Sequence, residues 1–130
     1  MLLVDDDPTT NFMHQLLLQK MGVAERLLVA ENGMEALHTL TQTCAAPDAS
    51  ACPGLILLDV NMPVMGGIEF LEAFQQLPLF SARRPVVFVL TTSTYERELE
   101  RLRALPIAGI ISKPLTREKV TAMLQEHFPA

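Results

Sequence analysis

The stretch that decides the fold is LILLDVNMP, which runs from Leu55 to Pro63. Its first four residues are all aliphatic, which predicts a short strand buried on both faces in the middle of a parallel sheet. The strand ends in the carboxylate of Asp59, and Pro63 prevents the chain from continuing as a strand. Open α/β sheets bind their ligands at the carboxyl ends of such strands, so Asp59 is the first candidate functional residue.

The composition fits one globular domain and argues against a nucleic-acid surface. The chain has 130 residues, 49% of them hydrophobic, and a formal net charge of −5. Phosphate backbones require clustered basic residues, and Arg83-Arg84 is the only adjacent basic pair. No apolar run approaches the roughly 20 residues that span a bilayer, and no basic flank of a signal peptide is present. We therefore expect a cytoplasmic protein without membrane or nucleic-acid contacts.

The two cysteines, Cys44 and Cys52, are expected to lie in one loop over residues 43–53. Thiols of cytoplasmic proteins are most often reduced, and we expect that state here. A disulfide or a metal site is the alternative, although no His or further Cys stands at ligand spacing. The three histidines, His14, His38 and His127, are interpreted as solvated or capping residues of separate helices.

Strands and helices alternate on both sides of the central strand. Further apolar runs predict strands at residues 2–4, 27–30, 86–90 and 107–111. Helical spacing predicts helices that start at Pro8 and after Gly33, that cover residues 68–76 and 96–104, and that follow Thr116 as far as His127. Such alternation predicts a parallel sheet covered by helices on both faces, with right-handed crossovers. We expect a single domain over residues 1–130, with no output domain.

The first helix carries clear start and stop signals. Pro8 suits the first helical position, which places Asp7 at the N-cap, and Gly22 ends the helix. Its inward stripe is predicted to be Phe12, Leu16, Leu17 and Met21, and that of the second helix Met34, Leu37 and Leu40.

Polar and charged residues follow four of the predicted strands, and all parallel strands end on the same edge of the sheet. The side chains predicted to meet there are those of Asp5, Asp6, Asp59, Thr91 and Lys113. Carboxylates this close repel one another unless a cation joins them, and Mg²⁺ accepts such oxygen ligands while it keeps several waters. We expect Asp6 and Asp59 to bind directly, Asp5 through a water, and the backbone carbonyl of Asn61 to supply another oxygen.

An open Mg²⁺ site beside an ammonium and a hydroxyl suits a phosphoryl group. Lys113 and the metal would neutralise phosphoryl oxygens, and the Thr91 hydroxyl would donate to another. The sequence has no Gly-rich nucleotide loop, so a side chain is the more plausible phosphoryl acceptor. Asp59 lies in the middle of the group and is the candidate.

Four pieces of this sequence resemble the receiver domain of two-component response regulators, of the single-domain chemotaxis type. They are Leu3-Val4-Asp5-Asp6-Asp7, Leu58-Asp59-Val60-Asn61-Met62-Pro63 with Gly66-Gly67, Leu90-Thr91-Thr92, and Lys113-Pro114. They occur in order, each at a strand end, and the resemblance covers essentially the whole chain. It implies a flavodoxin-like, doubly wound α/β fold whose five parallel strands have the order 2-1-3-4-5 and are flanked by five helices.

The resemblance also implies a function for the residues that match. Asp59 would accept a phosphoryl group from a sensor histidine kinase or a histidine phosphotransfer protein in a Mg²⁺-dependent reaction. Asp5, Asp6, Asp59 and the carbonyl of Asn61 would serve the metal, while Thr91 and Lys113 would contact the phosphoryl oxygens. The chain would be a signalling domain and not an enzyme, apart from intrinsic Mg²⁺-dependent self-phosphorylation and self-dephosphorylation.

The family's output face is formed by the fourth helix, the fifth strand and the fifth helix, and would bind a downstream protein. The chain is expected to be a monomer or a weak homodimer. One residue departs from the family: Ile110 stands where an aromatic side chain in the fifth strand usually takes part in the switch.

Two other functions are possible for the same residues. A Mg²⁺-dependent phosphohydrolase of the dehalogenase type also uses an Asp at a strand end, but it places a second acid where this chain has Asn61, and it needs a cap domain. The other alternative is an interaction module of the same fold that is never phosphorylated.

Overall fold

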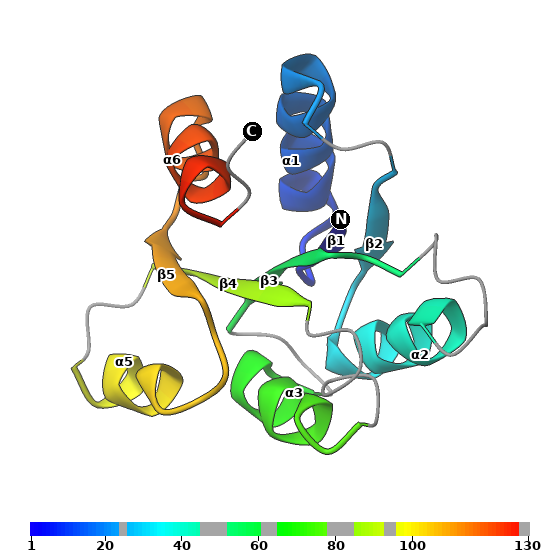
Figure 1. Ribbon diagram of the computed structural model, residues 1–130, viewed down its shortest axis with the longest axis vertical. Coiled ribbons are helices and arrows are strands. Elements are labelled where there is room, and N and C mark those ends of the chain that lie inside the picture. The colour runs from blue at the N-terminus through cyan, green and yellow to red at the C-terminus, as the bar shows by residue number, and fades with distance from the viewer. Residues whose placement is uncertain (24–25, 45–51, 61–64, 78–84, 93–95, 128–130) are drawn as a thin grey trace.

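The computed structural model describes residues 1–23, 26–44, 52–60, 65–77, 85–92 and 96–127. Within these residues five strands form one parallel sheet in the order β2-β1-β3-β4-β5, which confirms the expected fold class and strand order (Figure 1). The strands are β1 (Leu2–Val4), β2 (Leu28–Ala30), β3 (Leu55–Asp59), β4 (Val86–Thr91) and β5 (Gly109–Ser112).

The helices of the described residues cover both faces of the sheet. They are α1 (Pro8–Met21), α2 (Gly33–Cys44), α3 (Gly67–Phe74), α5 (Glu96–Arg103) and α6 (Arg117–His127). Figure 1 shows α1 and α6 on one face, and α2, α3 and α5 on the other. In the described part of the chain, no helix is both long and apolar enough to cross a lipid bilayer.

The central strand β3 contributes side chains to a hydrophobic cluster on each face of the sheet. Every residue of β3 is buried, and alternate side chains point to opposite faces, as in any strand. Ile56 and Leu58 belong to the larger cluster, and Leu55 and Leu57 to the other. The prediction of a strand buried on both faces is therefore confirmed.

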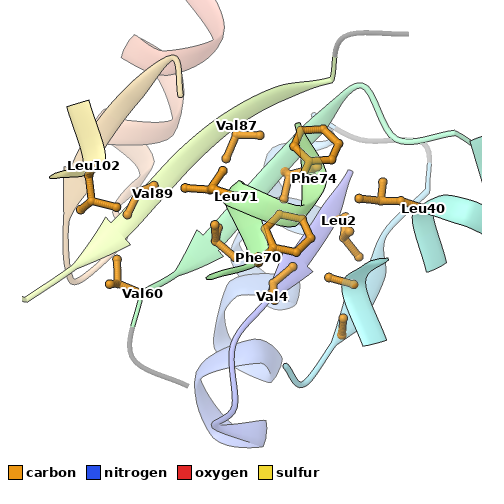
Figure 2. Close-up of a cluster of buried hydrophobic side chains, with 14 of the residues drawn as sticks. Leu2, Val4, Leu40, Val60, Phe70, Leu71, Phe74, Val87, Val89 and Leu102 are labelled. Carbon is orange, nitrogen blue, oxygen red and sulfur yellow. The ribbon is translucent and has the colours of Figure 1, made fainter. Parts of the chain in front are cut away.

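Two aromatic side chains of α3 occupy the middle of the larger cluster. The rings of Phe70 and Phe74 are stacked, with centroids 5.6 Å apart, and both side chains are fully buried. Figure 2 shows them beside side chains of β1, including Leu2 and Val4. This packing fixes α3 against the sheet directly after the segment that follows Asp59.

The ends of α1 agree with the sequence signals. The Asp7 carboxylate accepts a hydrogen bond from the backbone N–H of Thr9 at 3.0 Å, and Pro8 is the first helical residue. Gly22 adopts a left-handed conformation with φ of 63°, and its N–H donates to the Gln19 carbonyl.

The predicted inward face of α1 is confirmed in part: Leu17 and Met21 pack against the second hydrophobic cluster, but Phe12 and Leu16 do not point inward. Phe12 is 58% exposed and Leu16 is 37% exposed, whereas Asn11 and Leu18 are buried. The physical reason lies in a polar contact: the Asn11 amide donates to the Asp5 carbonyl at 2.8 Å, which turns this side of the helix toward the sheet. A helix with apolar residues on several sides does not reveal its orientation through hydrophobic periodicity.

The predicted inward stripe of α2 is confirmed at Leu37 and Leu40, which pack in the larger cluster, and is wrong at Met34. Met34 is 54% exposed, and the buried positions include Ala36, Leu40 and Cys44. The helix continues through Cys44, so the expected loop does not begin at Thr43. Residues 45–51, which belong to that loop, lie outside the described residues.

The expectation of two reduced thiols is wrong, because Cys44 and Cys52 form a disulfide. Their Cα atoms lie 4.6 Å apart at a sequence separation of 8. The extension of α2 through Cys44 brings the end of this helix next to the residues that precede β3. Both cysteines pack in the larger hydrophobic cluster, so the bond ties α2 to the start of the central strand.

Candidate phosphoryl and metal site

The site residues lie at the carboxyl ends of the parallel strands. Asp59 is the last residue of β3 and pairs in register with Leu90 of β4. Thr91 ends β4 and pairs with Ser112 of β5. Since the register aligns the ends of these strands, the residues that follow each of them meet at one edge.

An ammonium lies between two carboxylates at this edge. Lys113 Nζ is 3.0 Å from Asp5 Oδ2 and 3.1 Å from Asp59 Oδ1. The Lys113 side chain is 21% exposed, while those of Asp5 and Asp59 are 5% and 9% exposed. The structure therefore brings together residues that are 54 and 108 positions apart in the sequence.

Asp6 adds a third carboxylate. Asp5, Asp6 and Asp59 each offer an oxygen, and these oxygens all lie within 4.8 Å of one another. Asp6 is exposed, whereas the other two are buried, so the cluster faces solvent on one side. An oxygen-only donor set that is open to water fits a hard divalent cation such as Mg²⁺. Asn61, whose carbonyl was expected to join this set, lies outside the described residues.

The electrostatics of the site favour an additional cation. Burial raises the pKa of the Asp59 carboxyl, and the nearby Asp5 raises it further, while the hydrogen bond from Lys113 opposes both effects. Burial by itself would lower the pKa of the Lys113 ammonium, but its hydrogen bonds with Asp5 and Asp59 outweigh burial and raise it. A single ammonium thus compensates only part of the charge of three carboxylates, and a metal ion would relieve the remaining repulsion between them.

The end of β4 supports the position of Lys113. Thr91 is buried, and its backbone carbonyl accepts a hydrogen bond from the Lys113 N–H at 2.9 Å. Thr91 follows Leu90, the register partner of Asp59, so it lies at the same edge as the carboxylates.

His14 is a buried residue beside the site, and its interpretation as a solvated or capping residue is wrong. It is buried on α1, and burial lowers the pKa of its imidazole, which the Asp5 carboxylate partly offsets. It lines a cavity of about 550 Å³ together with Thr9, Met13, Leu17, Thr92 and Lys113, among others. The missed signal is the spacing of Asn11 and His14, which puts two polar side chains on one face of α1.

The chain is similar in sequence to known proteins. A sequence model of the family "Response regulator receiver domain" matches residues 1–125. The two-component response regulator ARR22 of Arabidopsis thaliana is 31% identical, over 99% of this chain and 83% of its own length. A probable chemotaxis protein CheY of Rhizobium etli is 28% identical, over 99% of this chain and 92% of its own length.

Solved structures show the same likeness. A two-component response regulator from Cytophaga hutchinsonii superposes with a TM-score of 0.83 at 26% identity, with 96% of this chain and 92% of that chain covered. The chemotaxis protein CheY4 of Vibrio cholerae gives a TM-score of 0.73 at 30% identity, with coverages of 96% and 94%.

Receiver domains are signalling modules of two-component phosphorelays that bind Mg²⁺ through a cluster of Asp residues and interact with histidine kinases or phosphotransfer proteins. Asp5, Asp6 and Asp59 form an acidic cluster of this kind at the expected edge of the sheet. The family match extends over nearly the whole chain, from the strand that precedes Asp5 to the last helix. The chain therefore belongs to the response regulator receiver domain family and resembles the CheY-type members of that family.

Proposed function

We propose that Asp59 accepts a phosphoryl group from the phosphohistidine of a sensor kinase or phosphotransfer protein, in a Mg²⁺-dependent reaction. The observation that carries the proposal is the pair of contacts from Lys113 Nζ to Asp5 and Asp59, at 3.0 and 3.1 Å, inside a cluster of three carboxylates. In this proposal residues 1–130 act as one cytoplasmic receiver domain, as a monomer or a weak homodimer.

Asp59 is the nucleophile. An ionised oxygen of Asp59 forms a bond to phosphorus as the bond from phosphorus to the donor's imidazole nitrogen breaks, and the released imidazole takes a proton from water. The raised pKa of Asp59 opposes its ionisation in the absence of a cation, so charge compensation precedes attack. The Lys113 ammonium lies against Asp59 Oδ1, within reach of the oxygens of an incoming phosphoryl group.

Asp5, Asp6 and Asp59, with the carbonyl of Asn61, would hold Mg²⁺. The bound metal supplies charge neutralisation for the carboxylates and for the oxygens of the transferring phosphoryl group. Asp6, the exposed member, leaves the cluster accessible to solvent, and water reaches the acyl phosphate for self-dephosphorylation from the same side. Small phosphodonors enter by this route in self-phosphorylation. Thr91 would donate its hydroxyl to a phosphoryl oxygen.

The phosphoryl group would signal by altering protein contacts on the surface formed by α5, β5 and α6. Phosphorylation converts the singly charged Asp59 carboxylate into an acyl phosphate that carries about two negative charges and offers new hydrogen-bond acceptors at the edge that carries Thr91 and Lys113. Ile110 of β5 packs against the larger hydrophobic cluster and pairs with Val89, so an aliphatic side chain occupies the usual aromatic position. NMR spectra with and without beryllofluoride, an analogue of the phosphoryl group, would detect the change. We expect amide shifts in α5, β5 and α6, and shifts confined to the acidic cluster would contradict this output.

Phosphorylation itself is tested by incubation with acetyl phosphate and Mg²⁺ followed by intact mass measurement. We expect one phosphoryl adduct on the wild type and none on Asp59→Asn. Asp7→Asn is the matched control, because it neutralises a neighbouring carboxylate while Asn still caps α1, and it should retain the adduct. An unmodified wild-type protein would instead support an interaction module that is never phosphorylated. Turnover of a generic phosphate ester would support a phosphohydrolase.

A further inference from the structure

The loop that carries Lys113 is held by a second lysine, Lys119. Lys119 Nζ donates to the Ser112 carbonyl at 2.7 Å, to the Pro114 carbonyl at 3.0 Å and to Ser112 Oγ at 3.3 Å. An ammonium has three N–H donors, so these three acceptors use all of them. The two carbonyls belong to the residues directly before and directly after Lys113.

The anchor of this contact is the first turn of α6. Thr116 caps the helix, since its hydroxyl oxygen accepts a hydrogen bond from the Lys119 N–H at 3.3 Å. A positive charge near a helix N-terminus is electrostatically unfavourable, so the dipole of α6 does not stabilise the Lys119 ammonium. The loop carbonyls do stabilise it, because their partial negative charge faces the ammonium.

Three hydrogen bonds consequently hold the backbone at and around Lys113. Its own N–H donates to the Thr91 carbonyl at 2.9 Å, and the carbonyls on either side of it are bound by Lys119. The side chain of Lys113 is a flexible stem of four carbons that ends in the ammonium. Because the stem adds its own freedom, the ammonium stays between Asp5 and Asp59 only if the backbone of Lys113 is held in place.

We propose that Lys119 is a positioning residue for phosphorylation, acting through the backbone of Lys113 to keep the Lys113 ammonium between the two carboxylates. This inference rests on the proposed phosphorylation of Asp59. The alternative is a purely structural role, in which Lys119 stabilises the turn after β5 without any effect on the reaction.

The first test measures the rate of phosphorylation of Lys119→Met over a range of acetyl phosphate concentrations. We expect the maximal rate to fall about tenfold, in line with the effect of small misplacements of reacting groups, at an unchanged half-saturating donor concentration. Lys119→Arg keeps a cation with several N–H donors and should recover most of the rate. Arg117→Met removes a positive charge from an exposed position on the same turn and should behave as the wild type.

A double-mutant cycle distinguishes positioning from general stabilisation. If Lys119 acts through Lys113, Lys119→Met causes no further loss of rate in a Lys113→Met background. Equal losses in both backgrounds would overturn the proposal, as would a wild-type rate in Lys119→Met alone. A wild-type protein without any adduct on Asp59 would instead refute the proposed function.

Hydrogen exchange of the Lys113 amide tests the positioning without any phosphorylation. This amide donates to Thr91, so its exchange should accelerate at least about tenfold in Lys119→Met, while the β3 amides keep their protection. Unchanged exchange at Lys113, or equal acceleration throughout the sheet, would overturn the proposal whatever the outcome of the kinetic tests.

Discussion

Strand β3 is held differently at its two ends. Just before the strand, Cys52 is bonded covalently to Cys44 at the end of α2, inside a hydrophobic cluster. At the other end Asp59 contacts one ammonium and lies within 4.8 Å of two further carboxylates. The amino end is cross-linked and apolar, whereas the carboxyl end concentrates negative charge. The stability of β3 therefore comes from its packed, cross-linked amino end, whereas its carboxyl end has excess negative charge available for a cation.

The largest effect is expected from the charge at the carboxyl end. Lys113→Met leaves Asp5 and Asp59 without their cation and should lower the free energy of unfolding by about 3 kcal/mol in metal-free buffer at neutral pH. This is the low end of the range for broken buried pairs, because the ammonium is partly exposed. Chemical denaturation measures the change. Lys20→Met, an exposed control on α1, should cost about 0.5 kcal/mol or less.

Mg²⁺ should compensate for the loss of the Lys113 ammonium. The cation replaces the missing ammonium, so saturating Mg²⁺ should stabilise Lys113→Met more than it stabilises the wild type. Equal stabilisation of the two proteins would show that the lysine and the metal do not serve the same carboxylates.

The next effect concerns the amino end. Reduction of the bond between Cys44 and Cys52 should lower the free energy of unfolding by about 2–3 kcal/mol, as expected for a short loop, and Tm by roughly 10 °C. Thermal unfolding with and without dithiothreitol measures it. A Cys44→Ser/Cys52→Ser variant should unfold at the Tm of the reduced protein, and dithiothreitol should not change its Tm.

The disulfide and the carboxylates lie at opposite ends of β3, so reduction should leave phosphorylation of Asp59 unchanged. A wild-type protein whose Tm does not respond to the reductant, or whose phosphorylation stops on reduction, would contradict independent roles for the two ends of β3.

The smallest effect is the pH dependence that Asp59 contributes. Its pKa is raised in the folded protein, so the folded state keeps a proton at pH values where the unfolded chain has released it. In metal-free buffer this contribution makes the free energy of unfolding fall as pH rises from the ordinary carboxyl pKa through the raised pKa of Asp59. Asp59→Asn removes this contribution, and denaturation over a pH series with a chelator compares the two. Parallel curves for both proteins would contradict the raised pKa.

Most of the fold and the place of the site were predictable from local patterns. The apolar run that ends at Asp59, and similar runs before Asp5, Thr91 and Lys113, predicted a parallel sheet whose ends meet at one edge. The strand order was not available from these patterns, since hydrophobicity does not state which strands are neighbours. It came from the resemblance to receiver domains.

Three features were not predicted correctly from these patterns. The inward face of α1 carries the hydrogen bond from Asn11 to the Asp5 carbonyl, and the spacing of the apolar residues alone does not indicate that face. His14, three residues after Asn11, is buried on the same face of the helix. The disulfide depends on the continuation of α2 through Cys44, and helix ends are among the least certain features of a sequence.

A Mg²⁺ titration followed by amide NMR tests the single metal site at the carboxyl end of the sheet most directly. We predict saturable shifts at the carboxyl ends of the strands, around Asp5, Asp59 and Lys113, with none around Cys44 and Cys52, and much weaker binding by Asp59→Asn. Shifts that spread evenly over both ends of β3, or that persist with full affinity in Asp59→Asn, would contradict a single metal site at the edge where these carboxylates meet.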